Sequence, residues 1–323
     1  MRSAGSPMEL HDAVAVITGA SRGLGLAIAR ELATQGARLV LCARDADRLE
    51  AAAAELRAGG TETLVVPCDV ADPEAVDRLV ARALDAFGRI DLLVANAGEM
   101  AVGPIESQTR EDFAQAIGVM LWGVVHPALA VLPSMQARGS GTIVVISSIG
   151  GKVSVPHLLP YSTAKFGATG FAEGLRAEVV KDGVRVVTVI PGLMRTGSPR
   201  NAWFKGRHRA EYAWFVIGDS LPLLSISARR AARRIVEAAR RGQPELILTP
   251  AAHLAVRLHG LAPGLVIRLF SAVNRLLPGP PGPPRPPDGT SVRRRGADSE
   301  SAVTASPLTW LTRRAAARYR QGG

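Results

Sequence analysis

Seven short apolar runs recur along the first 250 residues, and they constrain the fold of the chain more than any other feature. They are AVAVIT (13–18), RLVLCA (38–43), TLVVP (63–67), DLLVAN (91–96), TIVVIS (142–147), VRVVTVI (184–190) and ELILT (245–249). Runs that are apolar almost throughout suit strands buried on both faces, and most stretches between them are long enough for a helical crossover. The pattern predicts an α/β protein with a doubly wound parallel sheet of about seven strands and helices on both faces.

The formal net charge of +11 is carried mainly by the end of the chain. Residues 1–250 contribute only +3, whereas residues 251–323 contribute +8. The nearly neutral body lacks the clustered basic surface of a nucleic-acid binder, so no nucleic-acid partner is expected. Cys42 and Cys68 are too few for a disulfide scaffold and lack metal-ligand spacing. They predict a reducing, cytoplasmic location and no metal site.

The longest uncharged stretch, residues 113–137, exceeds the roughly 20 residues that a helix needs to cross a bilayer. It also contains Gln115, His126 and two prolines. The stretch lies between the fourth and fifth predicted strands, where the alternating pattern requires a covering helix. We therefore expect a buried helix here rather than a transmembrane span.

A glycine-rich turn follows the first predicted strand. It has the sequence TGASRGLG (18–25) and leads into the helical stretch LAIARELATQG. Glycines in such a turn let backbone N–H groups approach a pyrophosphate, and the N-terminus of the helix adds favourable positive potential. The turn therefore predicts dinucleotide binding by a Rossmann-type fold.

The end of the second predicted strand indicates which dinucleotide is bound. NAD-binding proteins commonly place an acid about 20 residues beyond the glycines, where it contacts the adenosine ribose. This chain has Ala43 and Arg44 there, and Arg22 of the glycine-rich turn can converge with Arg44 on a 2'-phosphate. We expect NADP(H) to be preferred over NAD(H). In the alternative, both arginines are solvated and Asp45 binds the ribose after a shifted turn.

Tyr161 and Lys165 form the second chemical signal, within the sequence YSTAK. Residues four apart share one face of a helix, so both side chains can project into one site. A phenol with a pKa of about 10 transfers protons poorly at neutral pH. A nearby ammonium favours the phenolate and lowers that pKa. The pair predicts a tyrosine that acts as acid and base beside a lysine that tunes it.

These signals occur with others in a fixed order. Along the chain come the glycine-rich turn, Asn96-Ala97-Gly98 after the fourth strand, Ser148 after the fifth, Tyr161 and Lys165, and Pro191-Gly192 after the sixth. In this order and spacing, residues 10–250 closely resemble the short-chain dehydrogenases/reductases (SDRs). The resemblance implies an oxidoreductase that interconverts a ketone or aldehyde and an alcohol by hydride transfer, working as a homodimer or homotetramer.

The resemblance also assigns roles to single residues. Ser148 would hold the substrate oxygen, Tyr161 would act as acid and base, and Lys165 would bind the nicotinamide ribose and tune Tyr161. The other cofactor contacts would come from the turn and from the ends of the strands: Gly19, Ser21, Arg22, Gly23, Leu24, Gly25, Arg44, Asp69, Val70, Asn96, Ala97, Gly98, Pro191, Gly192 and Thr196.

Met120 departs from the SDR pattern. The family usually has an asparagine at this place in the helix between the fourth and fifth strands, and that asparagine is thought to hold a water that links the lysine to solvent. A thioether cannot replace the amide donors and acceptor, so proton resupply would be slower or would need another polar group. This leaves an alternative function open, namely a catalytically impaired NADPH-binding protein that its basic C-terminal region recruits to a membrane or a partner.

Five of the 14 aromatic residues of the chain lie close together where SDRs place a substrate lid. They are Trp203, Phe204, Tyr212, Trp214 and Phe215. Such an apolar patch favours a bulky, lipophilic carbonyl substrate. The alternative use of the patch is packing between subunits.

The alternation of strands and helices stops near Pro250. Residues 251–262 and 264–277 are predicted as two basic amphipathic helices, which could cover the substrate pocket, pack on a subunit or lie peripherally on an anionic inner-membrane surface. Residues 278–323 are predicted as a proline-rich linker and a basic, disordered tail, with one short helix around 307–320. The chain thus divides into a flexible N-terminus (1–10), a catalytic domain (11–250), a helical extension (251–277) and this linker and tail.

Overall fold

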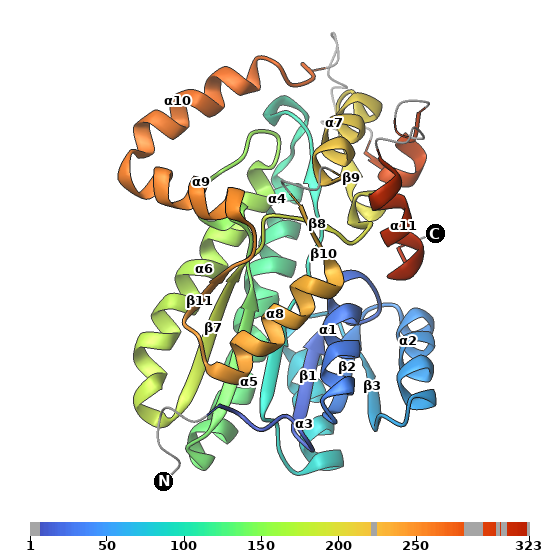
Figure 1. Ribbon diagram of the computed structural model, residues 1–323, viewed down its shortest axis with the longest axis vertical. Coiled ribbons are helices and arrows are strands. Elements are labelled where there is room, and N and C mark those ends of the chain that lie inside the picture. Colours follow the sequence, from blue (N-terminus) through green and yellow to red (C-terminus); the bar gives the residue numbers. More distant parts are fainter. Residues whose placement is uncertain (1–6, 221–224, 281–292, 302–303, 305–308, 322–323) are drawn as a thin grey trace.

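Seven strands form one parallel sheet in the order β11-β7-β6-β4-β1-β2-β3 (Figure 1). The structure is a computed structural model that describes residues 7–220, 225–280, 293–301, 304 and 309–321. The strands are β1 (Val14–Thr18), β2 (Arg38–Ala43), β3 (Thr63–Pro67), β4 (Leu92–Ala95), β6 (Gly141–Ile146), β7 (Val184–Ile190) and β11 (Glu245–Ile247). Six of the seven apolar runs contain one of these strands, and β6 begins one residue before the seventh run. The predicted doubly wound sheet is therefore confirmed.

Successive residues of each strand enter different cores. Ala15 and Ile17 of β1 pack with the helices of one face, whereas Val14 and Val16 pack with those of the other. The first face carries α1 (Gly23–Thr34), α2 (Ala46–Ala58) and α8 (Ala228–Arg241); the second carries α3 (Pro73–Phe87), α5 (Gly123–Arg138) and α6 (Leu159–Val179). Side chains that alternate across a strand explain why strands covered on both faces have no polar stripe.

The strand order reverses between β1 and β4, which pair directly with Val16 opposite Leu93. From β1 the chain passes through α1 to β2 on one side, and from β4 it reaches β6 on the other. Open α/β sheets bind their ligands at the carboxyl ends of the strands beside such a reversal. The glycine-rich turn after β1 and Asn96 after β4 both lie at this place.

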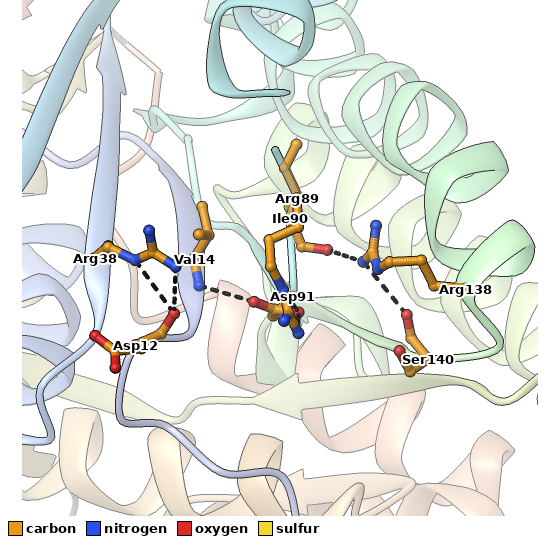
Figure 2. A network of polar contacts seen from close by, with 8 residues as sticks. All are labelled: Asp12, Val14, Arg38, Arg89, Ile90, Asp91, Arg138 and Ser140. Carbon is orange, nitrogen blue, oxygen red and sulfur yellow. Dashed lines mark hydrogen bonds and ion pairs between the residues drawn. The ribbon is translucent and has the colours of Figure 1, made fainter. Parts of the chain in front are cut away.

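The opposite, amino end of the sheet carries a polar network that joins the beginnings of strands (Figure 2). Asp91 accepts a hydrogen bond from the Val14 N–H at 3.0 Å and another from Arg89 Nε at 2.9 Å. Arg138, at the end of α5, donates to the carbonyl of Ile90. The buried carboxylate of Asp91 is therefore explained by its role in joining the strands.

The uncharged stretch 113–137 lies within one long helix that covers the sheet. It consists of α4 (Arg110–Ile117), a π-helical turn (Gly118–Trp122) and α5. By length and composition, Arg110–Arg138 could cross a membrane. Its residues Val124, Ala128 and Val131 are fully buried in the same core as the sheet, however. The predicted covering helix is therefore confirmed.

Short elements cap the carboxyl end of the sheet. β5 (Ala101–Val102), β9 (Trp203–Phe204) and β12 (Arg294–Arg295) form a small three-stranded sheet, and β8 (Leu193–Arg195) pairs with β10 (Ser225–Ser227). The helix α7 (His208–Ser220) contacts β8, β9 and β10. The predicted extension forms α9 (Pro250–Leu261) and α10 (Pro263–Asn274), which project beside this cap (Figure 1).

The short helix predicted around 307–320 is present as α11 (Trp310–Arg318), but the disorder predicted for the rest of the C-terminal tail is wrong for its described residues. β12 pairs with β9, and α11 packs against α7. Tyr319 is only 5% exposed within the core beside α1, and its carbonyl accepts a hydrogen bond from the Gly23 N–H at 2.9 Å. Composition missed this because a few apolar contacts order an otherwise polar segment. Most of the predicted proline-rich linker, residues 281–292, lies outside the described residues.

The predicted flexible N-terminus also needs correction for residues 7–10. Leu10 is buried in the core, and the Met8 N–H donates to the carbonyl of Arg240 at 2.7 Å. Residues 1–6 lie outside the described part of the chain.

Candidate active site

The glycine-rich turn lies directly against the end of β4. Gly19 has a φ of +66°, and a Cβ there would lie 2.9 Å from the Cα of Ala97. A Cβ on Gly25 would lie 2.2 Å from the carbonyl oxygen of Gly19. Only glycine fits either position, because a left-handed φ and such contacts both exclude a side chain. The turn therefore has the close backbone packing that lets a dinucleotide pyrophosphate approach its N–H groups.

The turn also presents hydrogen-bond donors. Ser21, Arg22 and Leu24 surround the start of α1, where backbone N–H groups have no partner within the helix. They lie at the amino end of α1, where the helix adds positive potential. Donors and potential of this kind fit the pyrophosphate of a dinucleotide.

Asn96 joins the ends of β1 and β4. Its Nδ2 donates to the carbonyl of Thr18 at 2.9 Å, and its backbone N–H donates to Thr18 Oγ1 at 2.9 Å. The Ala97 N–H donates to the same hydroxyl at 3.0 Å. Asn96 thus positions the turn, and its predicted contact with the cofactor ribose stays a prediction.

Arg44 is predicted to mark the adenosine end of the cofactor site. Its side chain is 58% exposed and pairs with Glu99 at 3.6 Å. The next residue, Asp45, caps α2: its Oδ1 accepts a hydrogen bond from the Arg48 N–H at 3.0 Å. It also pairs with the Arg48 guanidinium at 3.1 Å. Both carboxylate oxygens of Asp45 thus already have partners, which disfavours the alternative in which Asp45 binds the ribose.

Further residues at this end come from the turn and from the end of β3. Arg22 donates to Asn201 Oδ1 at 2.9 Å. Its pKa is lowered by burial and by the positive charges of surrounding arginines. Asp69 accepts a hydrogen bond from the Ala71 N–H at 3.0 Å, and Val70 is buried. Crowded positive charge of this kind suits an anionic ligand.

Ser148, Tyr161 and Lys165 come together at the carboxyl end of β6. Ser148 begins a short 3₁₀ turn and accepts the Gly150 N–H at 3.1 Å, and it hydrogen-bonds the Tyr161 side chain. Tyr161 and Lys165 occupy one face of the first turns of α6. Lys165 Nζ lies 5.9 Å from the centre of the Tyr161 ring and donates to the carbonyl of Ile146 at 2.7 Å.

The pKa of Tyr161 is shifted in the direction opposite to the expected one. Burial raises the pKa of its phenol, and the hydrogen bond with Ser148 opposes this rise without cancelling it. Burial lowers the pKa of Lys165 to about 8. The expected lowering is missing because the lysine ammonium bonds a backbone carbonyl rather than the phenol. Tyr161 therefore holds its proton at neutral pH and is ready to donate it.

The loop after β7 approaches the same place. The carbonyl of Pro191 accepts a hydrogen bond from the Ile149 N–H at 2.7 Å, directly after Ser148. A Cβ on Gly192 would lie 2.4 Å from Thr249 Oγ1, and the side chain of Thr196 is buried. The loop is thus fixed beside the catalytic candidates, and its predicted contact with nicotinamide stays a prediction.

Met120 lies in the π-helical turn and is only 1% exposed. It packs beside Gly98, where a Cβ would lie 3.7 Å from the methionine sulfur. Single π-helical turns inside helices are frequent at functional sites. The residue that replaces the asparagine of the family therefore fills an apolar position next to the Asn96-Ala97-Gly98 segment.

Two buried residues near the site had no recognisable pattern in the sequence. His157 Nδ1 lies 2.8 Å from a carboxylate oxygen of Glu211, and Trp214 Nε1 donates to the same carboxylate at 2.7 Å. His157 also has a φ of +65°, a strained conformation for a residue with a side chain. The pair is 54 residues apart and joins the segment before Tyr161 to α7. A lone histidine and a lone glutamate gave no signal that could have linked them.

A cavity of about 430 Å³ adjoins this segment. Its walls are the loops 103–106 and 153–157 and residues of α6, α9 and α10, including Leu159, Phe166, Val266, Ile267 and Phe270. The aromatic residues of the expected lid do not line it. Instead Phe204, Tyr212 and Phe215 pack on one another, with ring centres 5.2 and 6.1 Å apart, and form a small core that Tyr161 contacts.

Residues 13–204 match the family model described as short chain dehydrogenase. The chain belongs to the short-chain dehydrogenase family. It is 35% identical over 270 residues to "Dehydrogenase/reductase SDR family member 7B" of Bos taurus, covering 81% of this chain and 82% of that protein. It is 41% identical over 185 residues to "Granaticin polyketide synthase putative ketoacyl reductase 1" of Streptomyces violaceoruber, covering 57% of this chain and 68% of that protein.

Among solved structures, the chain is similar to L-sorbose reductase from Gluconobacter frateurii complexed with NADPH and L-sorbose. The TM-score is 0.66 at 30% identity, with 75% of this chain and 97% of that chain covered. Family and neighbours agree with the site geometry: the chain is an SDR oxidoreductase that acts on carbonyl and alcohol groups.

Proposed function

We propose that the chain is an NADP(H)-dependent reductase that converts a lipophilic ketone or aldehyde into an alcohol, and that it catalyses the reverse oxidation with the same groups. The observation that carries this proposal is the cluster of Ser148, Tyr161 and Lys165 at the carboxyl end of β6, on the same edge of the sheet as the glycine-rich turn. Reduction of a carbonyl by hydride transfer needs an acid that gives a proton to the carbonyl oxygen, and Tyr161 takes this role in the proposal.

Each catalytic candidate then has a definite task. A bound nicotinamide supplies or accepts the hydride. Ser148 holds the substrate oxygen by a hydrogen bond, and Tyr161 gives its proton to that oxygen as negative charge develops on it. The raised pKa of Tyr161 keeps the phenol protonated until then. Lys165 binds the ribose of the cofactor and adds positive charge behind the tyrosine.

Preference for NADP(H) over NAD(H) rests on Arg44 and Arg22. The charges of the two arginines act on one another, and the nearest acid in sequence, Asp45, is engaged as the cap of α2. A 2'-phosphate gains charge-assisted hydrogen bonds from such arginines, whereas a free ribose hydroxyl gains little. The similar L-sorbose reductase was solved with NADPH, which agrees with this preference.

A lipophilic substrate is supported by the apolar surroundings of Tyr161. The tyrosine ring contacts the small core of Val102, Leu158 and Phe204. The cavity of about 430 Å³ adjoins the residues that precede it, and its lining is mostly aliphatic and aromatic. Pockets of this size and character take bulky apolar ligands.

A carbonyl screen with the full chain tests this function. We expect oxidation of NADPH with large apolar ketones and aldehydes, and slower turnover with small polar ketones or with NADH as the donor. Faster turnover of small polar ketones would contradict the lipophilic substrate. Turnover with none of the compounds, despite NADPH binding, would favour the alternative of an impaired protein in which Met120 blocks proton resupply.

We also propose that α9 and α10 bring the enzyme into peripheral contact with an anionic membrane, at the inner surface of a cytoplasmic membrane. On α10, Val266 and Phe270 face the cavity, whereas Leu265, Leu269 and Val273 are exposed on another side. The described residues 246–280 contain Arg257, Arg268 and Arg275 but no Asp or Glu. An exposed apolar stripe with only positive charges suits the surface of an anionic bilayer.

Flotation with liposomes checks this contact. The full chain is expected to float with vesicles that contain anionic lipid and to remain unbound with neutral ones. Leu265→Ser/Leu269→Ser should abolish flotation, and Leu129→Ser, at an exposed leucine of α5, should not. A chain that fails to float but forms a stable dimer through α9 and α10 would contradict membrane contact and support the homo-oligomer that the family resemblance implies.

A further inference from the structure

The C-terminal strand β12 lies next to the adenosine end of the cofactor site. It pairs antiparallel with β9, and Arg295 lies opposite Trp203. The Gly296 N–H donates to the Ala202 carbonyl at 2.9 Å. A Cβ on Gly296 would lie 1.9 Å from the carbonyl oxygen of Pro199, so only glycine lets the segment after β12 lie this close to Pro199. The segment is therefore held in a fixed register.

Two arginines of this segment pack on one indole. The guanidinium carbons of Arg293 and Arg295 lie 4.4 and 4.5 Å from the centre of the Trp203 ring. Cation–π contacts at this distance hold a guanidinium in place while its N–H groups remain able to bind a ligand. Trp203 thus holds two positively charged side chains that come from the C-terminal part of the chain.

The segment that contains Trp203 is joined to the glycine-rich turn by a hydrogen bond. Arg22 donates to Asn201 Oδ1 at 2.9 Å, and Asn201 is only two residues before Trp203. The positive charge of Arg295 lowers the pKa of Arg22 by more than that of Arg44 does. Arg295 therefore acts on the same place as the two arginines already assigned to the cofactor.

Two carboxylates lie near these arginines. Asp45 pairs with Arg48 at 3.1 Å, and Glu99 pairs with Arg44 at 3.6 Å and so offsets one of the three charges. The charges of Arg22 and Arg295 remain in excess, and they repel one another until an anion binds. A phosphate monoester, with a charge of about −1.5 to −2 at neutral pH, is the anion that gains most from several guanidiniums.

We propose that the C-terminal tail completes the 2'-phosphate site of the cofactor, with Arg295, held on Trp203, as a specificity-determining residue beside Arg22 and Arg44. This inference rests on the proposed use of NADP(H) and deepens it. The tail is then part of the cofactor site rather than an appendage.

Arg295→Gln and Arg294→Gln form a matched pair of variants for the test. Both remove one positive charge from β12, but successive residues of a strand point to opposite sides. Arg294 lies opposite Phe204, and its charge acts on His208 rather than on Arg22. The two variants therefore separate a charge at the proposed site from a charge nearby.

Calorimetric titration of the full-length variants with NADP⁺, NAD⁺, 2',5'-ADP and 5'-AMP measures the effect. We expect Arg295→Gln to raise the Kd for NADP⁺ and 2',5'-ADP by about tenfold, the factor expected for loss of one partly exposed charged contact. Its Kd for NAD⁺ and 5'-AMP, and all four values for Arg294→Gln, should stay within about twofold of the parent.

The result that overturns the inference is an equal loss for all four nucleotides, which would show a structural role, or no loss at all for Arg295→Gln. The parent chain tells this failure apart from failure of the proposed function. If the parent binds NAD⁺ as tightly as NADP⁺, the proposed cofactor preference itself is wrong. If the parent prefers NADP⁺ and Arg295→Gln keeps that preference, only the role of the tail is wrong.

Discussion

Tyr161→Phe is expected to lower NADPH-dependent carbonyl reduction by about 100- to 10,000-fold, the range that a positioned acid usually contributes. The substitution removes the hydroxyl that donates the proton and hydrogen-bonds Ser148, but it keeps the ring that packs against the small core around Phe204. The fold and the affinity for NADPH should therefore be unchanged. Steady-state kinetics and fluorescence titration with NADPH measure the two quantities.

Tyr212→Phe is the matched control for this loss. Tyr212 is also buried near the site, where burial raises the pKa of its phenol to about 12, but no chemical step is assigned to it. Its variant should keep the rate within a few-fold of the parent. A Tyr161→Phe enzyme as active as the parent would remove Tyr161 from the mechanism and with it the proposed reaction.

The pH dependence of the parent enzyme should follow from the state of Tyr161. Reduction needs the protonated phenol, and burial raises its pKa, so the reductive rate should hold through neutral pH and fall only at alkaline pH. Oxidation needs the phenolate, so its rate should climb over the same alkaline range. If bound cofactor adds the effect of the Lys165 charge, the pKa of Tyr161 falls. The reductive rate would then fall, and the oxidative rate rise, at a lower pH.

The sheet could be predicted from the sequence because its signal is local and repeated. Each strand is a short apolar run, and both faces of the sheet are covered, so side chains on either side of β1 are equally apolar. Gly88 and Gly139 end α3 and α5 in the left-handed conformation, as glycine at this position commonly does.

The candidate site could also be predicted, because its residues follow strands directly. Parallel strands bring their carboxyl ends to one edge, so short motifs far apart in sequence meet there. The direction of the Tyr161 pKa shift could not be predicted in this way. It depends on where the Lys165 ammonium points, and the ammonium bonds the Ile146 carbonyl through a contact that no spacing rule encodes.

Contacts between distant polar residues were not predictable. His157 meets Glu211, and Arg295 meets Trp203, although nothing in either residue's neighbourhood marks its partner. The ordered tail belongs to the same class, because Tyr319 is one apolar residue within a polar segment. Composition describes such a segment on average, whereas a few specific contacts decide whether it is ordered.

Another contact of this class joins the lid to α4 and predicts the largest effect on stability. Lys205, directly after β9, forms an ion pair with Asp112, and their side chains are only 3% and 4% exposed. Lys205→Met keeps the length of the side chain but leaves the buried carboxylate without its partner. Breaking such a pair typically costs about 3 to 5 kcal/mol, so the free energy of unfolding measured in urea should fall by that amount.

A double-mutant cycle separates the charge from the packing in this loss. Asp112 also accepts the Thr109 N–H at 2.7 Å at the start of α4, and asparagine can keep that acceptor without a charge. Asp112→Asn in the Lys205→Met background should therefore recover most of the lost stability, because no unpaired charge stays buried. If instead the two losses simply add, the pair contributes no coupling energy, and the lid is held by the small aromatic core around Phe204 rather than by this ion pair.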